Sequence, residues 1–255
     1  PCPDRGRQYK AGWCEMSFRL EYKKIRRTGL TAAFLAGGII AAALPVINTA
    51  ARPDTFTSMA GSPAAVLADA NLQLISMLNL LLITAGACIL YHIEYADNAL
   101  QKMQSLPVRE SGLFIGKCGI LLPFFLMIIL FETASLCFCG WHWLDAGKEE
   151  LMEILQTLGF TLILTLPSAI IALVIASACR NMWTALGIGI LCIFMATMLP
   201  TDNFIVSLFP YVLPFQILPG METARVFHYC IASVCESAAA CAAEIIYLKV
   251  RRLFA

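Results

Sequence analysis

The stretch GLFIGKCGILLPFFLMIILFETASLCF, residues 112–138, contains two charged side chains, Lys117 near its start and Glu132 near its end. A helix needs about 20 predominantly apolar residues to cross the hydrocarbon core of a bilayer. This stretch is long enough and apolar enough to do so. The sequence therefore predicts a transmembrane helix here, with Pro123 as the residue at which it bends.

Five other apolar stretches are also long enough to be considered as membrane spans. Together with 112–138 they predict an all-α, polytopic membrane protein with six transmembrane helices. The six predicted spans cover residues 29–50, 72–93, 112–138, 154–178, 183–199 and 226–248.

The composition of the whole chain agrees with this class. Hydrophobic residues make up 59% of its 255 residues and charged residues only 14%. Soluble domains are about half apolar and about a quarter charged. The chain therefore lacks the charge to cover a water-exposed surface, and little length remains for a soluble domain. Residues 1–15 are polar and end just before Met16, so we expect a leader, tag or extension followed by one transmembrane domain over 16–255.

Two segments outside the spans have distinctive patterns. Phe18, Tyr22 and Ile25 recur at helical spacing among basic residues, which predicts an amphipathic elbow helix in the headgroup layer. Residues 200–223 are apolar but interrupted by Pro210, Pro214, Pro219 and Gly220. Such a broken segment is unsuited to span, so we expect a re-entrant hairpin before the last helix.

The basic residues divide unequally between the two sides of the predicted bundle. Three of the 18 lysines and arginines (Arg52, Lys148 and Arg225) fall on one side, and the remaining fifteen fall on the side of the N-terminus. Cytoplasmic segments carry the excess of Lys and Arg. Both termini are therefore expected in the cytoplasm, with the acidic loop 145–153 outside.

The sequence offers no motif for catalysis or for a bound cofactor. The string from Gly112 to Lys117 has the wrong glycine spacing for a phosphate-binding loop. The histidines His92, His142 and His228 lie far apart, and the cysteines form no C-x-x-C pair. We therefore predict no metal site, no cofactor held by this chain and no nucleic-acid partner, with membrane lipid as its surroundings.

Three glutamates lie inside the predicted spans, where burying a charge is costly and usually functional. Glu236 is the best candidate because it lies near the predicted midplane. Glu244 either contributes to a translocation path or extends toward the interface, and Glu132 either anchors a loop or contacts substrate. Asn79 is interpreted as a hydrogen-bonding contact between helices.

The order of these features resembles the permease subunit of ABC-2-type ABC transporters. The resemblance rests on the basic helix before the first span, on Glu94 followed by Leu106-Pro107-Val108-Arg109 after the second span, and on the broken hairpin. In its small size and compact loops, the chain most resembles the lantibiotic-immunity permeases. The resemblance implies an ATP-driven exporter of antimicrobial peptides in the bacterial cytoplasmic membrane, with ATP and Mg on a separate P-loop ATPase subunit.

The resemblance also implies roles for particular residues. A coupling helix that docks on the ATPase would contain Glu94, Asp97, Leu100, Lys102, Met103, Leu106, Pro107 and Arg109. A second permease, identical or a sister chain, would meet small residues that allow close helix approach, namely Gly37, Gly38, Ala41, Gly187 and Gly189. The alternatives are a proton-coupled secondary transporter and an intramembrane enzyme, either of them using Glu236.

Overall fold

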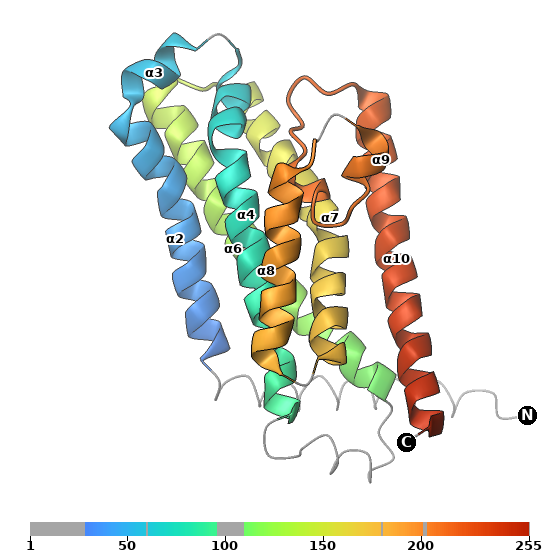
Figure 1. The fold of residues 1–255 in the computed structure, drawn as a ribbon. Coiled ribbons are helices and arrows are strands. Elements are labelled where there is room, and N and C mark those ends of the chain that lie inside the picture. The colour runs from blue at the N-terminus through green and yellow to red at the C-terminus, as the bar shows by residue number, and fades with distance from the viewer. Residues whose placement is uncertain (1–28, 60, 96–109, 180, 201–202, 255) are drawn as a thin grey trace, which may run out of the picture.

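The computed structural model describes residues 29–59, 61–95, 110–179, 181–200 and 203–254. The predicted elbow helix, residues 1–15 and most of the predicted coupling helix lie outside these ranges. All regular structure in the described residues is helical, which confirms the predicted all-α fold. Six helices run side by side in one bundle (Figure 1): α2 (Leu30–Ala51), α4 (Pro63–Tyr95), α6 (Glu110–Trp143), α7 (Lys148–Ala178), α8 (Met182–Met198) and α10 (Thr223–Phe254).

Five of these six helices are long and apolar enough to cross a membrane, and α8, with 17 residues, is shorter. The chain is thus a multi-pass membrane protein, as predicted. We name the end of the bundle at which α2 begins and α10 ends the proximal end, and the opposite end the distal end (Figure 1).

Several helices extend further at the distal end than predicted. Helix α4 begins at Pro63, where the Ser62 hydroxyl accepts a hydrogen bond from the Ala65 amide. Proline is favoured in a first turn, and serine caps its free amides. Helix α7 begins at Lys148, with Glu149 and Glu150 in its first turn, where acidic residues interact favourably with the helix dipole.

The predicted outer loop between the third and fourth spans is therefore mostly helical. Trp141 and Trp143, which lie between the predicted spans 112–138 and 154–178, belong to the last turn of α6. The connection shrinks to residues 144–147, and Asp145 adopts a left-handed backbone there with φ of 47°. Aspartate tolerates this conformation better than most residues, so the chain can reverse within a few residues.

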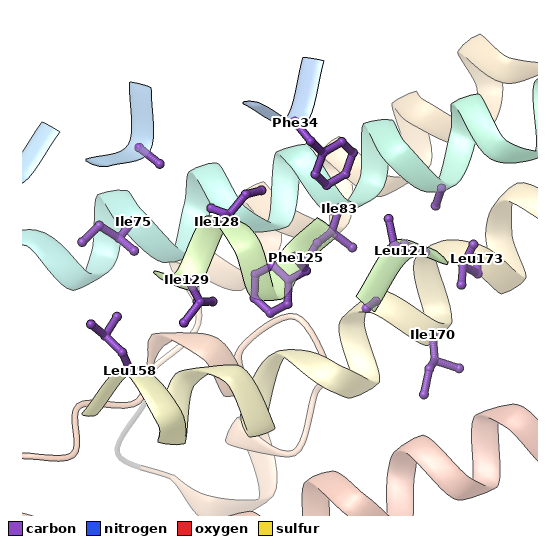
Figure 2. Packing of buried hydrophobic residues seen from close by; sticks show 14 of the residues in the cluster. Phe34, Ile75, Ile83, Leu121, Phe125, Ile128, Ile129, Leu158, Ile170 and Leu173 are labelled. Carbon is purple, nitrogen blue, oxygen red and sulfur yellow. The ribbon is translucent and has the colours of Figure 1, made fainter. Parts of the chain in front are cut away.

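The core of the bundle is a continuous layer of apolar side chains from α2, α4, α6 and α7. Figure 2 shows Phe34 of α2, Ile83 of α4, Phe125 of α6 and Leu173 of α7 within it. Phe34 lies over Gly86, where an added Cβ would be 2.6 Å from the ring. The close approach of α2 to α4 therefore depends on the absence of a side chain at that glycine.

The proline-rich segment after α8 folds back onto the distal half of the bundle (Figure 1). It contains α9 (Phe204–Ser207) and the 3₁₀ turn η2 (Leu213–Phe215), and the Tyr211 and Val212 side chains are buried. Proline residues interrupt the helical hydrogen bonds, which leaves backbone carbonyls needing donors. Ser168 of α7 donates to the carbonyl of Pro210, and Ser76 of α4 donates to that of Pro214 at 2.7 Å.

Candidate functional site

A buried ion pair joins α4 to α6 near the proximal end. The Lys117 ammonium lies 2.9 Å from a carboxylate oxygen of Glu94, and the two side chains are only 1% and 3% exposed. Lys117 also donates to the carbonyl of Leu90 at 2.8 Å and lies 4.7 Å from the centroid of the Tyr91 ring. Such extra contacts offset the cost of removing two charges from water.

Two further helices are connected at the same end of the bundle. The Tyr95 hydroxyl donates to the carbonyl of Ser177 at the end of α7. The Ser177 hydroxyl donates to the carboxylate of Glu244 on α10, which is 2% exposed. We name Glu94, Tyr95, Lys117, Ser177 and Glu244 the proximal cluster. It connects the proximal ends of α4, α6, α7 and α10 through polar contacts.

The position of the proximal cluster relates it to the connection between α4 and α6. Tyr95 is the last residue of α4, and Lys117 lies about two turns into α6. Residues 96–109 connect these two helices. The proximal cluster therefore lies at the two helix ends that this connection joins in the chain.

The structure places Glu94 differently from the coupling-helix prediction. Its carboxylate points into the bundle and pairs with Lys117, so it presents no surface to a separate protein. The physical reason is that α4 continues through Tyr95, which keeps Glu94 on the buried face of a spanning helix. The other predicted coupling-helix residues lie outside the described ranges: Asp97, Leu100, Lys102, Met103, Leu106, Pro107 and Arg109.

The small residues predicted to meet a second permease mostly pack within the chain itself. An added Cβ at Gly37 would be 2.6 Å from the Leu82 side chain, and one at Gly38 would be 2.8 Å from Phe131. Ala41 is fully buried in the same core. These residues allow α2 to approach α4 and α6, so the chain covers the surface that the prediction assigned to a partner.

The two predicted glycines of α8 differ from one another. An added Cβ at Gly189 would be 2.3 Å from the Thr84 methyl group of α4, so this glycine serves an internal helix contact. An added Cβ at Gly187 would have no neighbouring atom within 4 Å. Of the two, only Gly187 leaves room for another molecule.

The intramembrane glutamates have distinct surroundings. Glu132, predicted near the outer edge, accepts a hydrogen bond from Asn79, the middle residue of α4. Glu132 therefore lies deeper than predicted, because α6 extends beyond it to Trp143. Glu236 is half-buried on α10, and its Oε2 atom has no hydrogen-bond partner among the described residues. Glu244 belongs to the proximal cluster.

The partner of Glu94 was missed by the sequence analysis. The sequence analysis interprets Lys117 only as a basic charge near the start of a span and as part of a string unsuited to bind phosphate. A usable signal is present, because Glu94 directly follows one predicted span and Lys117 lies near the start of the next. Charges in such positions are expected to pair within the protein.

Comparison with known proteins places this multi-pass membrane protein in a class of transporter subunits. The family model described as ABC-2 family transporter protein matches residues 17–196. The chain therefore belongs to the ABC-2 transporter family, whose members are transmembrane subunits of ABC transporters that work with an ATP-binding subunit. No match was found among curated proteins or among solved structures.

Proposed function

We propose that the chain is the permease of an ATP-driven exporter in a bacterial cytoplasmic membrane, with its proximal end in the cytoplasm. The fifteen-to-three division of basic residues supports this orientation. In this proposal the segment from Asp97 to Arg109 forms the coupling helix on a P-loop ATPase, which supplies ATP and Mg. The segment starts three residues after Glu94, the buried partner of Lys117.

The observation that carries this proposal is the proximal cluster. A coupling element must move several helices together when the ATPase closes. The ion pair and the hydrogen bonds of the cluster connect four helices at the position where the α4–α6 connection enters the bundle. A buried polar network that is satisfied makes the elements that it joins more rigid.

We propose lantibiotic-like antimicrobial peptides as the substrate, exported for self-immunity or resistance. Acidic side chains outnumber basic ones among the described residues of the distal end, which favours a cationic substrate. The acidic residues there are Asp54, Asp69, Asp145, Glu149, Glu150, Glu153 and Glu222, and the basic ones are Arg52, Lys148 and Arg225. A distal cavity of about 370 Å³, lined by Asp69, Gln73 and Thr197 among others, offers polar contacts next to apolar ones.

A second permease, identical or a sister chain, remains part of the proposal. The positions on α2 are occupied by contacts within the chain, so we retain only Gly187 among the predicted interface residues. A cysteine at this position would crosslink to a second copy if α8 faces it. A crosslink that forms only when two different permeases are expressed would identify a sister chain.

The test of the proposed function is survival of a producing cell that carries the chain and its ATPase. Leu106→Asp should abolish peptide resistance while leaving the amount of folded protein in the membrane unchanged. Normal resistance in this variant would count against the coupling-helix assignment. The alternative of proton coupling through Glu236 predicts instead that Glu236→Gln abolishes substrate uptake in vesicles without ATP.

A further inference from the structure

A carboxyl group and a carboxamide face each other between α6 and α4 in the middle of the bundle. Asn79 Nδ2 donates a hydrogen bond of 3.0 Å to Glu132 Oε2. The Glu132 side chain is 0% exposed and that of Asn79 is 1% exposed. We name these two residues the central pair.

The central pair leaves one atom of each group without a partner. Glu132 Oε1 and Asn79 Oδ1 are both buried, and neither has a hydrogen-bond partner among the described residues. A carboxylate oxygen and an amide oxygen can only accept hydrogen bonds. As an ionised pair, the two groups would thus leave two buried acceptors unsatisfied beside one another, which is costly.

No cation from the described helices balances a charge on Glu132. Helices α2 and α8 contain no charged residue, and Lys117, about four turns earlier on α6, is paired with Glu94. The other helices that pack on α6 do contain charged residues and histidines. These are Asp69, His92 and Glu94 of α4, then Lys148, Glu149, Glu150 and Glu153 of α7, and Arg225, His228, Glu236, Glu244, Lys249, Arg251 and Arg252 of α10. Beyond Lys117, α6 itself adds His142. The thiols nearest in sequence are Cys137 and Cys139.

These groups lie toward the ends of their helices or are themselves acidic. On α4, Asp69 and His92 lie on either side of the middle of the helix and far from it. On α7, all the charged residues fall in the first two turns. Within the described ranges, Asn79 is the only side chain that hydrogen-bonds Glu132. An isolated carboxylate in such surroundings is strongly disfavoured relative to the neutral acid.

We propose that Glu132 is a proton-binding site and that, when protonated, it forms a cyclic acid–amide pair with Asn79. The Oε1 hydroxyl of the protonated acid donates a hydrogen bond to Asn79 Oδ1, while Asn79 Nδ2 donates a hydrogen bond to Oε2. One proton thus satisfies both atoms that otherwise lack partners. The inference is independent of the proposed function, because it follows from the chemistry of the two groups alone.

The protonated central pair connects the same two helices that residues 96–109 connect at the proximal end. Loss of the proton removes the hydrogen bond from Glu132 to Asn79. Two acceptor atoms, Glu132 Oε1 and Asn79 Oδ1, then face each other. Protonation of Glu132 therefore stabilises the contact between α4 and α6, and entry of water between them favours release of the proton.

The experiment is infrared difference spectroscopy of the protein in lipid, wild type minus Glu132→Gln, at neutral pH. Glutamine can form the matching amide–amide pair, so this variant should keep the fold. The expected result is the carbonyl band of a protonated carboxylic acid in the wild type, absent from Glu132→Gln and retained in Glu236→Gln. Carboxylate bands in place of the acid band at neutral pH would overturn the proposal.

A second variant keeps the test decisive if Glu132→Gln is poorly folded. In Asn79→Leu the acid band should persist but move to higher frequency, because the carbonyl loses the amide donor. An unmoved band would show that Asn79 does not pair with the acid and would overturn the cyclic arrangement. Loss of the wild-type band on adding sodium at constant pH would assign the site to a metal cation and overturn the proton site.

Discussion

The proximal cluster and the central pair both contain a buried glutamate that faces a neighbouring helix, yet their chemistry differs. Glu94 forms an ion pair with Lys117, which also donates to the Leu90 carbonyl, whereas Glu132 accepts a hydrogen bond from the carboxamide of Asn79. The first site keeps both charges at a fixed geometry among four helices. The second is satisfied only when its acid is neutral. Two carboxyl groups that are buried to a similar extent thus have different partners, and we infer that the partner sets the charge of each.

The largest effect is expected from breaking the ion pair. Lys117→Met leaves Glu94 buried without its cation, which costs about 3–5 kcal/mol of stability for pairs of this kind. Thermal or denaturant unfolding in mild detergent measures it. The double variant Lys117→Met with Glu94→Gln should recover much of the loss, since no unpaired charge remains. Equal loss in the single and double variants would show that the charges are not the cause.

The central pair should respond differently from the ion pair, because replacing its acidic residue by the matching amide removes no required charge. Glu132→Gln preserves the two hydrogen bonds and should leave stability nearly unchanged. Asn79→Leu removes the hydrogen bond that the acid accepts from Asn79 and should cost about 1–3 kcal/mol. If Glu132→Gln instead destabilised the protein as much as Lys117→Met does, Glu132 would be ionised and the contrast between the two sites would disappear.

Helix α8 provides a matched pair of glycines for testing the packing against α4. Gly189→Ala places a methyl group against Thr84, and overpacking of this kind costs about 1–3 kcal/mol. Gly187→Ala meets no atom and should be neutral or gain up to about 1 kcal/mol from helix propensity. Unfolding midpoints of the two variants compare them directly, and similar values would contradict the described contact of α8 with α4.

The smallest effect is expected where a serine supports the proline-rich segment. Ser76→Ala removes the hydrogen bond to the Pro214 carbonyl and should cost about 1 kcal/mol, the usual value for one hydrogen bond. Protease cleavage within residues 208–220 should increase in this variant. Ser58→Ala, which changes an exposed serine at the end of the short helix α3 (Pro53–Ser58), serves as the control.

The sequence was sufficient for the class of fold and for the approximate span positions, because long apolar runs have few alternatives to transmembrane helices. It did not predict the distal helix extensions, since the acidic start of α7 resembles a loop in composition. Small residues at Gly37 and Gly38 indicated a close helix contact correctly, but spacing alone does not say whether the partner helix belongs to the same chain.

The candidate sites were predictable to different degrees. The pairing of Lys117 with Glu94 is signalled by two opposite charges at the adjoining ends of consecutive spans, Glu94 directly after one and Lys117 near the start of the next. The interpretation of Asn79 as an interhelical contact is confirmed by its hydrogen bond to Glu132. The sequence does not indicate which turn of α4 lies opposite Glu132. Side-chain packing across the whole bundle sets this alignment of the two helices.

We propose that the connection after α4 couples the proximal cluster to a separate ATPase. The most direct test is affinity purification of the tagged protein from its host in mild detergent, comparing the wild type with Leu106→Asp by mass spectrometry. We expect a P-loop ATPase to copurify with the wild type in stoichiometric amount and to be lost from the variant. A clean wild-type preparation without an ATPase, even after crosslinking, would contradict the account.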